Sequence, residues 1–155
     1  MGVYDKYQKL KEPEKVFLWL HPIAAAEFDA NAAVALEDAQ KRFGGASLHN
    51  GSGDAFRHCF WSAMNARDEG EELAEAFGSA HESDPGNPSK EKAMDLFNNS
   101  VGFGIGKNLY GASNRQLAVL CVQAWTERKL VQLDVASAGD LTYSNSTERY
   151  LYEKR

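Results

Sequence analysis

The sequence predicts a mainly α-helical fold, a single-domain bundle of about six helices with a short β-hairpin near the C-terminus. Apolar residues recur every three or four positions over most of the chain, as they do on the buried face of a helix. Glycine and proline separate these segments, and alternation of apolar residues begins only at residue 131. Because 155 residues with 43% hydrophobic and 25% charged residues fit one globular domain, we expect a single domain over 1–155.

Tyr4, Tyr7 and Leu10 have helical spacing before Pro13, and two further helices are expected in the first part of the chain. Val16, Trp19 and Leu20 have helical spacing behind a proline, which suits the first turn of a helix. Residues 23–43 form an alanine-rich helical pattern that ends at a Gly-Gly pair, and this helix is expected to act as scaffold. The apolar positions of the second pattern are Phe28, Val34, Leu36, Ala39 and Phe43.

Three further helical segments carry most of the rare polar residues. A glycine-containing turn at 47–53 precedes the first segment, which Ser52 or Asp54 can cap. The second segment covers 71–82. After a loop with two prolines and a glycine, the third segment begins at Ser89.

The remainder of the chain predicts one more helix and the hairpin. The glycines of the sequence VGFGIGK fit neither phosphate-loop spacing, so we expect either close helix packing at these glycines or a helix that loses regularity near Gly111. Ser113 is expected to cap an apolar helix over 116–129. Leu141 and Tyr143 supply a second alternating segment, which together with residues 131–135 predicts the hairpin.

The polar residues of the three central segments have spacings that place them on one face of a helix. Asp54 and His58 lie four positions apart, and Asp95 and Asn99 repeat that spacing. Apolar residues flank them, so these polar groups interrupt surfaces that should be buried and must be paired or used in chemistry. We therefore expect one active-site cleft. Its candidate catalytic residues are Asp54, Arg57, His58, His81, Glu82, Asp95, Asn98 and Asn99.

Three kinds of role fit this set of residues. As oxygen and nitrogen ligands without thiolates, they suit a divalent cation such as zinc, calcium, magnesium or manganese. Without a metal, His58 or His81 would act as a general base, while Arg57 and Asn98 or Asn99 stabilise a developing negative charge. In a third alternative the residues form a buried polar network in a non-catalytic binding module. The candidate metal ligands are Asp54, His58, His81, Glu82 and Asp95.

Charge, hydropathy and cysteine content exclude several classes. A net charge of −5 argues against nucleic acid as a partner, because non-specific binding to phosphate backbones needs clustered Lys and Arg. The apolar runs are too short for a transmembrane helix, and no Sec signal peptide is recognisable, so synthesis in the cytoplasm is expected. Cys59 and Cys121 are too few for a disulfide framework and are expected to be buried, reduced thiols.

Three short motifs resemble those of a family of small helical bacterial domains. The motif DAxRH stands at 54–58, HE at 81–82 and MDxxNNxxG at 94–102, within a motif core of 47–107. Members often carry a basic residue after the last motif, where this chain has Phe103. Such domains lie in secreted or wall-associated bacterial proteins of the polymorphic-toxin type. The resemblance therefore implies a toxin-like or effector-like hydrolase with antibacterial action.

The expected substrate contains phosphate or belongs to the cell envelope, because a guanidinium such as that of Arg57 matches the geometry of a phosphate group. A peptidoglycan hydrolase is one alternative. A phospholipase A2-like lipase is another, since the sequence RHCF at 57–60 is similar to the His-containing helix of prokaryotic phospholipases A2, without the aspartate that follows the histidine there. An effector of this kind implies export by a specialised secretion system and an immunity protein as partner.

Overall fold

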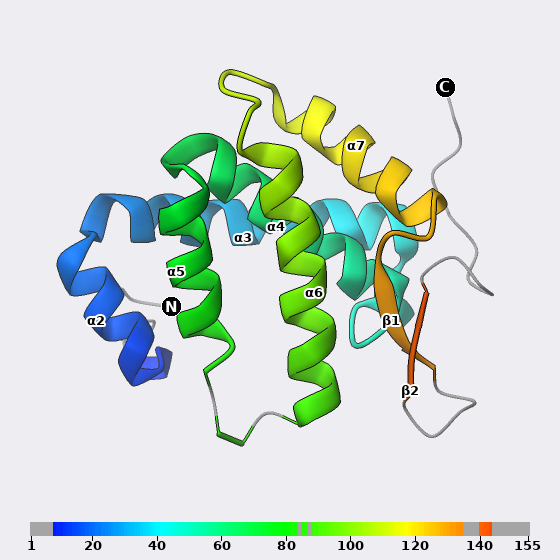
Figure 1. Ribbon diagram of the computed structural model, residues 1–155, viewed down its shortest axis with the longest axis horizontal. Coiled ribbons are helices and arrows are strands. Elements are labelled where there is room, and N and C mark those ends of the chain that lie inside the picture. The colour runs from blue at the N-terminus through cyan, green and yellow to red at the C-terminus, as the bar shows by residue number, and fades with distance from the viewer. Residues whose placement is uncertain (1–7, 84, 87, 135–139, 144–155) are drawn as a thin grey trace.

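The computed structural model describes residues 8–83, 85–86, 88–134 and 140–143, and these residues form six α-helices and one antiparallel pair of strands (Figure 1). The predicted mainly α-helical class is confirmed. The helices are α2 (Glu12–Leu20), α3 (Pro22–Phe43), α4 (Ser52–Glu69), α5 (Glu71–His81), α6 (Ser89–Gly106) and α7 (Asn114–Thr126). A 3₁₀ turn (Gly45–Ser47) follows α3, and strands β1 (Val131–Asp134) and β2 (Asp140–Tyr143) follow α7.

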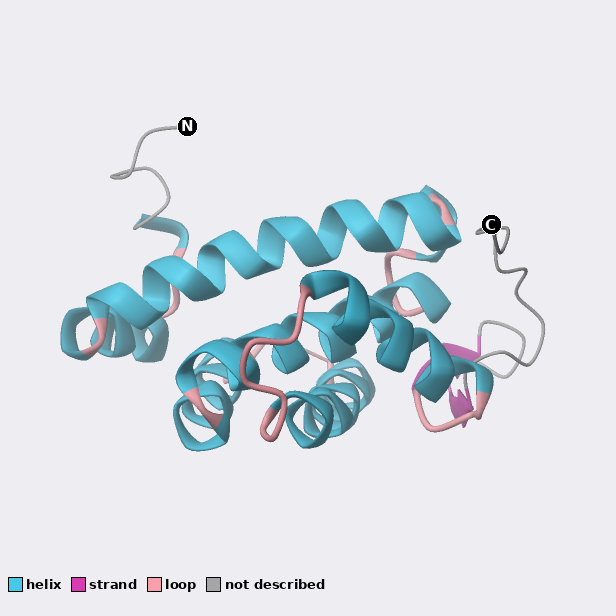
Figure 2. Ribbon diagram, turned by 90° about the horizontal axis from the view of Figure 1, so that it is seen from above, coloured by secondary structure: helices cyan, strands magenta, loops and turns pink. Residues whose placement is uncertain are grey.

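Helix α4 is the centre of the molecule. It contacts α3, α5, α6, α7 and β1, and fourteen of its eighteen residues are buried. The long helix α3 runs along one side of the other helices (Figure 2). A helix enclosed on all sides must bury its polar residues together with its apolar ones, so the polar residues of α4 need partners inside the protein.

Two glycines of α6 bring this helix close to α4. A Cβ atom at Gly102 would lie 2.8 Å from Cβ of Ser62 and would overlap the carbonyl oxygen of Cys59. One turn later, a Cβ atom at Gly106 would overlap the carbonyl oxygen of Ala63. The expected close packing is therefore confirmed for these two glycines. Gly104 has open space around its Cβ position and takes no part in it.

Helix α7 has the predicted cap at Ser113, but it begins two residues before the predicted start at 116 and ends earlier than predicted. The Ser113 side chain accepts a hydrogen bond from the backbone N–H of Gln116, which completes a capping box. The helix stops at Thr126 rather than at residue 129, because Arg128 has a positive φ of 58° and Lys129 N–H bonds back to the Ala124 carbonyl. This is the hydrogen bond of a Schellman-type end.

The buried face of α2 differs from the predicted one, and the predicted apolar positions of α3 are buried only at Phe28, Ala39 and Phe43. On α2 the buried residues are Glu14 and Phe17, while Trp19 is 82% exposed. Phe17 takes the inner position because its ring packs on Phe28 and Phe77. Val16 and Leu20 are exposed on α2, and Val34 and Leu36 are exposed on α3.

The backbone pairing of two strands confirms the predicted hairpin. Strands β1 and β2 pair antiparallel, with Val131 opposite Tyr143 and Leu133 opposite Leu141. The Leu133 N–H donates to the Asn50 carbonyl, so β1 is tied to the turn in front of α4. Among the described helices, none has the length and apolar character needed to cross a membrane.

Candidate functional site

Three potential metal ligands converge where α4 and α6 lie side by side. Asp54 and His58 come from neighbouring turns of α4, and Asp95 comes from α6. His58 Nε2 lies 3.6 Å from Asp54 Oδ1 and 3.3 Å from Asp95 Oδ1. One ligand atom from each residue lies within 4.8 Å of the other two, so this triad can hold a metal ion.

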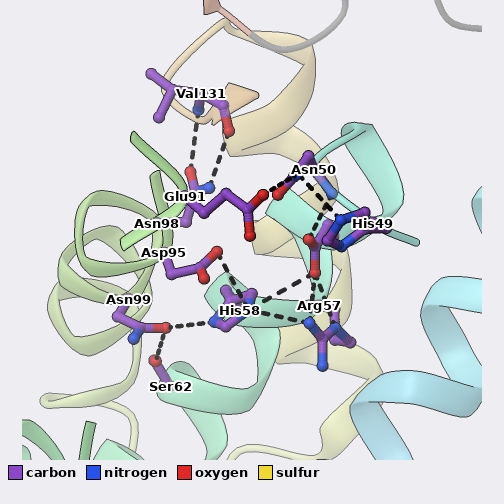
Figure 3. A network of polar contacts seen from close by, with 11 residues as sticks. His49, Asn50, Arg57, His58, Ser62, Glu91, Asp95, Asn98, Asn99 and Val131 are labelled. Carbon is purple, nitrogen blue, oxygen red and sulfur yellow. Dashed lines mark hydrogen bonds and ion pairs between the residues drawn. The ribbon is translucent and has the colours of Figure 1, made fainter. Parts of the chain in front are cut away.

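The orientation of the His58 ring is fixed from its other side. Nδ1 of His58 lies 3.2 Å from Oδ1 of Asn99, which also accepts a hydrogen bond from the Ser62 hydroxyl (Figure 3). An amide oxygen only accepts, so Nδ1 carries the ring proton and Nε2 presents its lone pair to the two aspartates. A histidine ligand is held in this way in many metal sites, with its outer N–H given to an oxygen.

The ionisation of the triad fits a cation as well. Burial, followed by the charge of Arg57, lowers the pKa of His58 to about 4, so the ring is neutral at pH 7. Burial and the charges of Glu82 and Asp54 raise the pKa of Asp95 to about 8. Burial also raises the pKa of Glu82. Several carboxyl groups close together in a partly buried site are difficult to ionise at the same time. A positive charge among them would favour their ionised forms.

Arg57 supplies one positive charge at the edge of the triad. Its Nε donates to Asp54 Oδ1 at 3.1 Å, and its Nη2 lies 3.1 Å from His58 Nε2. Asp54 Oδ2 accepts a further hydrogen bond from the Asn50 backbone N–H at 2.7 Å. The Arg57 side chain is 34% exposed, so this guanidinium reaches both the buried aspartate and the solvent.

A cavity of about 400 Å³ opens above the triad. It brings together two cationic side chains, two histidines and two carboxyl groups from four different segments. The lining residues are Lys11, Arg57, His58, His81, Glu82, Gly86, Pro88 and Asp95. A cavity of this size with charged walls can accept a small polar group.

His81 enters the cavity from the end of α5 and has a partner that sequence reasoning missed. Its Nδ1 lies 2.7 Å from Oε1 of Glu14, a buried residue of α2. Glu14 sits in the first turn of α2, where an acidic residue is ordinary, so its sequence position gave no sign of burial against a histidine. Only the packing of α2 on α5 reveals the pair.

The predicted site residues thus divide into three groups. Asp54, His58 and Asp95 form the triad, and Asn99 and Arg57 contact it. His81 and Glu82 line the same cavity without belonging to the triad. Asn98 does neither: its side chain donates to the Val131 carbonyl at 2.9 Å and accepts from the Val131 N–H at 3.0 Å, which anchors β1 on α6.

The two cysteines lie outside the site. Cys59 and Cys121 are both free and buried, as expected. Burial, together with a hydrogen bond between the Cys121 thiol and Cys59, raises the pKa of the Cys121 thiol well above its usual range. A buried thiol that resists ionisation is a packing group rather than a nucleophile.

Comparison with known proteins gives a family but no structural relative. A protein-family model described as "Domain of unknown function (DUF6973)" matches residues 15–129. This range contains the triad and all eight predicted site residues, whereas Lys11 and Glu14 lie just in front of it. No solved structure matches the chain significantly.

Proposed function

The chain belongs to the DUF6973 family, and because that description assigns no activity, we propose a function from the site itself. The protein is a hydrolase that binds a divalent cation through Asp54, His58 and Asp95 and cleaves a phosphate-containing substrate. Zinc and manganese suit one imidazole and two carboxylates, and magnesium and calcium are the alternatives to be compared.

The observation that carries the proposal is the meeting of three potential ligand atoms in a buried site. Nε2 of His58 presents a lone pair, and Oδ1 of Asp95 is buried without a hydrogen bond among the described residues. Without a cation, the raised pKa of Asp95 keeps a proton on this carboxyl group at neutral pH, whereas a bound cation would take the place of that proton and stabilise the ionised carboxylates. Three protein ligands also leave coordination positions for water and substrate, as in catalytic sites.

Arg57 has a defined part in this proposal. The guanidinium lies against His58 Nε2, and this contact would be given up if His58 held a cation. Because the side chain is one-third exposed, it can turn towards the cavity while it stays next to Asp54. In that position Arg57 would meet a substrate oxygen beside the cation. A guanidinium and a divalent cation together are a common arrangement for holding a phosphate group.

The charge of the cavity favours a phosphate over a neutral substrate. The protein carries a net charge of −5, yet Lys11 and Arg57 both line this cavity. With a bound divalent cation, the site would carry local positive charge on an acidic molecule. Such a site attracts an anionic group without attracting long polyanions to the rest of the surface.

A metal-free mechanism with His58 as the general base is less well supported. A base with a pKa of about 4 takes a proton weakly at neutral pH, whereas the same neutral ring is a good ligand. The buried-network alternative predicts a site that binds no cation. Cation binding is therefore the measurement that separates the proposals.

The experiment is titration calorimetry with Zn²⁺, Mn²⁺, Mg²⁺ and Ca²⁺. We expect one of these ions to bind the wild type with a stoichiometry of one and to raise its melting temperature. His58→Ala and Asp95→Asn should each weaken binding at least about tenfold. His21→Ala is the matched control, because His21 is an exposed histidine that does not line the cavity. Equal binding by His58→Ala and the wild type, or no binding by the wild type, would reject the metal centre.

Activity is tested next on bis(p-nitrophenyl) phosphate and on phospholipid vesicles, with the tightest-binding ion present and after its chelation. Hydrolysis should require the ion and disappear in His58→Ala while persisting in His21→Ala. Hydrolysis of vesicles alone would narrow the substrate to phospholipids. Chelator-resistant hydrolysis would contradict the proposed role of the cation.

The motif resemblance leads us to propose an effector role for this hydrolase as well. In that role the substrate belongs to another bacterial cell, the protein leaves its producer by a specialised secretion system, and an immunity protein protects the producer.

A further inference from the structure

We propose that Glu14 and His81 form the proton-transfer pair of this site, with Nε2 of His81 as the atom that accepts a proton from a water molecule in the cavity. This inference rests on the proposed hydrolase function and adds the residues that activate the water. It assigns separate roles to the two histidines of the cavity.

The geometry of the pair is that of a carboxylate that orients an imidazole. Oε1 of Glu14 lies 2.7 Å from Nδ1 of His81, and Oε2 of Glu14 accepts a hydrogen bond from the Lys11 backbone N–H at 2.8 Å. Both carboxylate oxygens therefore have partners. The Glu14 side chain is only 5% exposed, whereas the His81 side chain is 43% exposed and lines the cavity.

The proton positions follow from these contacts. Burial alone would raise the pKa of Glu14, but the hydrogen bonds from His81 and Lys11 outweigh it and hold the pKa below its ordinary value. An ionised carboxylate only accepts, so Nδ1 of His81 carries the proton. Nε2 is then the ring nitrogen with the lone pair, on a side chain that is partly exposed and lines the cavity.

The ring is held in place from several sides. The imidazole packs against Trp61 with ring centroids 5.5 Å apart and against Phe77 with centroids 6.4 Å apart. The Lys11 ammonium group also donates to the His81 carbonyl, which joins the start of α2 to the end of α5. A group fixed in this way needs little reorganisation when it transfers a proton.

His58 cannot also act as the base that accepts a proton from water. Its Nε2 faces Asp54 and Asp95 in the buried triad, where it serves as a ligand. Of the four histidines in the sequence, His58 and His81 are the two that line the cavity. This leaves His81 as the histidine with both an orienting carboxylate and access to water.

In the hydrolysis of a phosphoester, His81 would act first as a base and then as an acid. Nε2 of His81 takes a proton from water while the water oxygen forms a bond to phosphorus, and the bond between phosphorus and the leaving oxygen breaks. The leaving oxygen keeps the electron pair of that bond and receives a proton from the His81 imidazolium or from solvent. Glu14 stays ionised throughout and stabilises the imidazolium.

The first test uses Glu14→Gln, which keeps the size of the side chain and removes its charge. We expect kcat on bis(p-nitrophenyl) phosphate to fall by about 10- to 100-fold with KM nearly unchanged. Glu12→Gln is the matched control, because Glu12 lies on the same helix and is exposed. For His81→Ala, added imidazole should restore part of the lost rate. Unchanged kcat in Glu14→Gln would overturn the inference.

A second measurement needs neither cation nor substrate. Long-range ¹H–¹⁵N spectra of the histidine rings should show His81 protonated at Nδ1 in the wild type and in Glu12→Gln, and a shift towards the Nε2–H form in Glu14→Gln. An Nε2–H ring in the wild type would overturn the pair even if the cation-dependent hydrolase is established. Loss of hydrolysis in Glu14→Gln, with chelator-resistant activity and an active His58→Ala, would instead reject the metal centre and keep the pair.

Discussion

Asp95 is a carboxyl group whose ionisation the fold opposes. Its pKa is raised to about 8, while in an unfolded chain it ionises near its ordinary value of 3.8. Between these pH values the folded protein holds a proton that the unfolded chain has lost, so stability falls as the pH rises. His58 acts in the opposite direction from about pH 4 to 6.5, because its folded pKa is lowered. Of these two effects, only that of Asp95 remains above pH 6.5.

This predicts that the wild type, freed of divalent cations, loses about 1–2 kcal/mol of unfolding free energy between pH 6.5 and pH 8. Asp95→Asn has no such carboxyl group and should lose much less over the same interval. Urea unfolding at the two pH values measures the difference, and Glu75→Gln, a change at an exposed residue of α5, serves as control. Parallel pH dependence in Asp95→Asn and the wild type would show that Asp95 ionises normally.

Two adjacent asparagines have separate roles that substitution can distinguish. Asn99 holds the His58 ring, whereas Asn98 satisfies the backbone N–H and carbonyl of Val131. Asn99→Ala should therefore weaken cation binding by about 10- to 100-fold. Asn98→Ala should instead cost about 1–3 kcal/mol of stability, because two backbone groups lose their partner, with cation affinity little changed. Calorimetry and urea unfolding of both variants measure these two effects. A loss of cation affinity in Asn98→Ala, with a loss of stability alone in Asn99→Ala, would contradict these roles.

At the scale of elements, the contact between α4 and α6 explains how the site is built. The same two helices carry the triad at one end of their contact and the glycines Gly102 and Gly106 at the other. Small residues at the glycine end let the backbones approach closely. His58 can then reach across to Asn99 and Asp95 with ordinary side-chain lengths.

Glycine substitutions on α6 should therefore differ by position. Gly102→Ala and Gly106→Ala place a methyl group against the backbone of α4 and should destabilise by about 1–3 kcal/mol or more. Gly104→Ala meets open space in mid-helix and should stabilise by about 0.5–1 kcal/mol. Thermal unfolding of the three variants tests this order. A loss of stability in Gly104→Ala equal to that in Gly102→Ala would contradict the assignment of the effect to close packing against α4.

The sequence predicts helix positions better than it predicts buried faces. Glycine, proline and Ser113 mark the ends of helices by local backbone chemistry, so the order of elements follows from neighbouring residues. The face of α2 depends on where α3 and α5 lie, and this long-range packing selects Phe17 over Trp19. The distinct contacts of Glu14 and Asn98 depend on the same packing, and no local pattern marks them.

At the scale of the whole molecule, the residues proposed for catalysis come from segments far apart in the chain. Glu14 lies on α2, Asp54 and His58 on α4, His81 on α5 and Asp95 on α6. A stable core must therefore form before any activity exists. Single substitutions in the triad are suitable for testing biological function, provided that the variant folds.

An effector hydrolase of this kind should harm a bacterial cell that produces it in the compartment where its substrate lies. We expect the wild type to slow growth when it is produced in the cytoplasm or when it is directed to the periplasm, depending on the substrate. His58→Ala should be harmless in the same compartment at the same protein level, because the cation ligand is lost, and His21→Ala should harm as the wild type does. Growth curves with immunoblotting of each variant measure this. Harmless wild type in both compartments, or equal harm from His58→Ala, would count against the effector role, whereas calorimetry would still report on the metal centre.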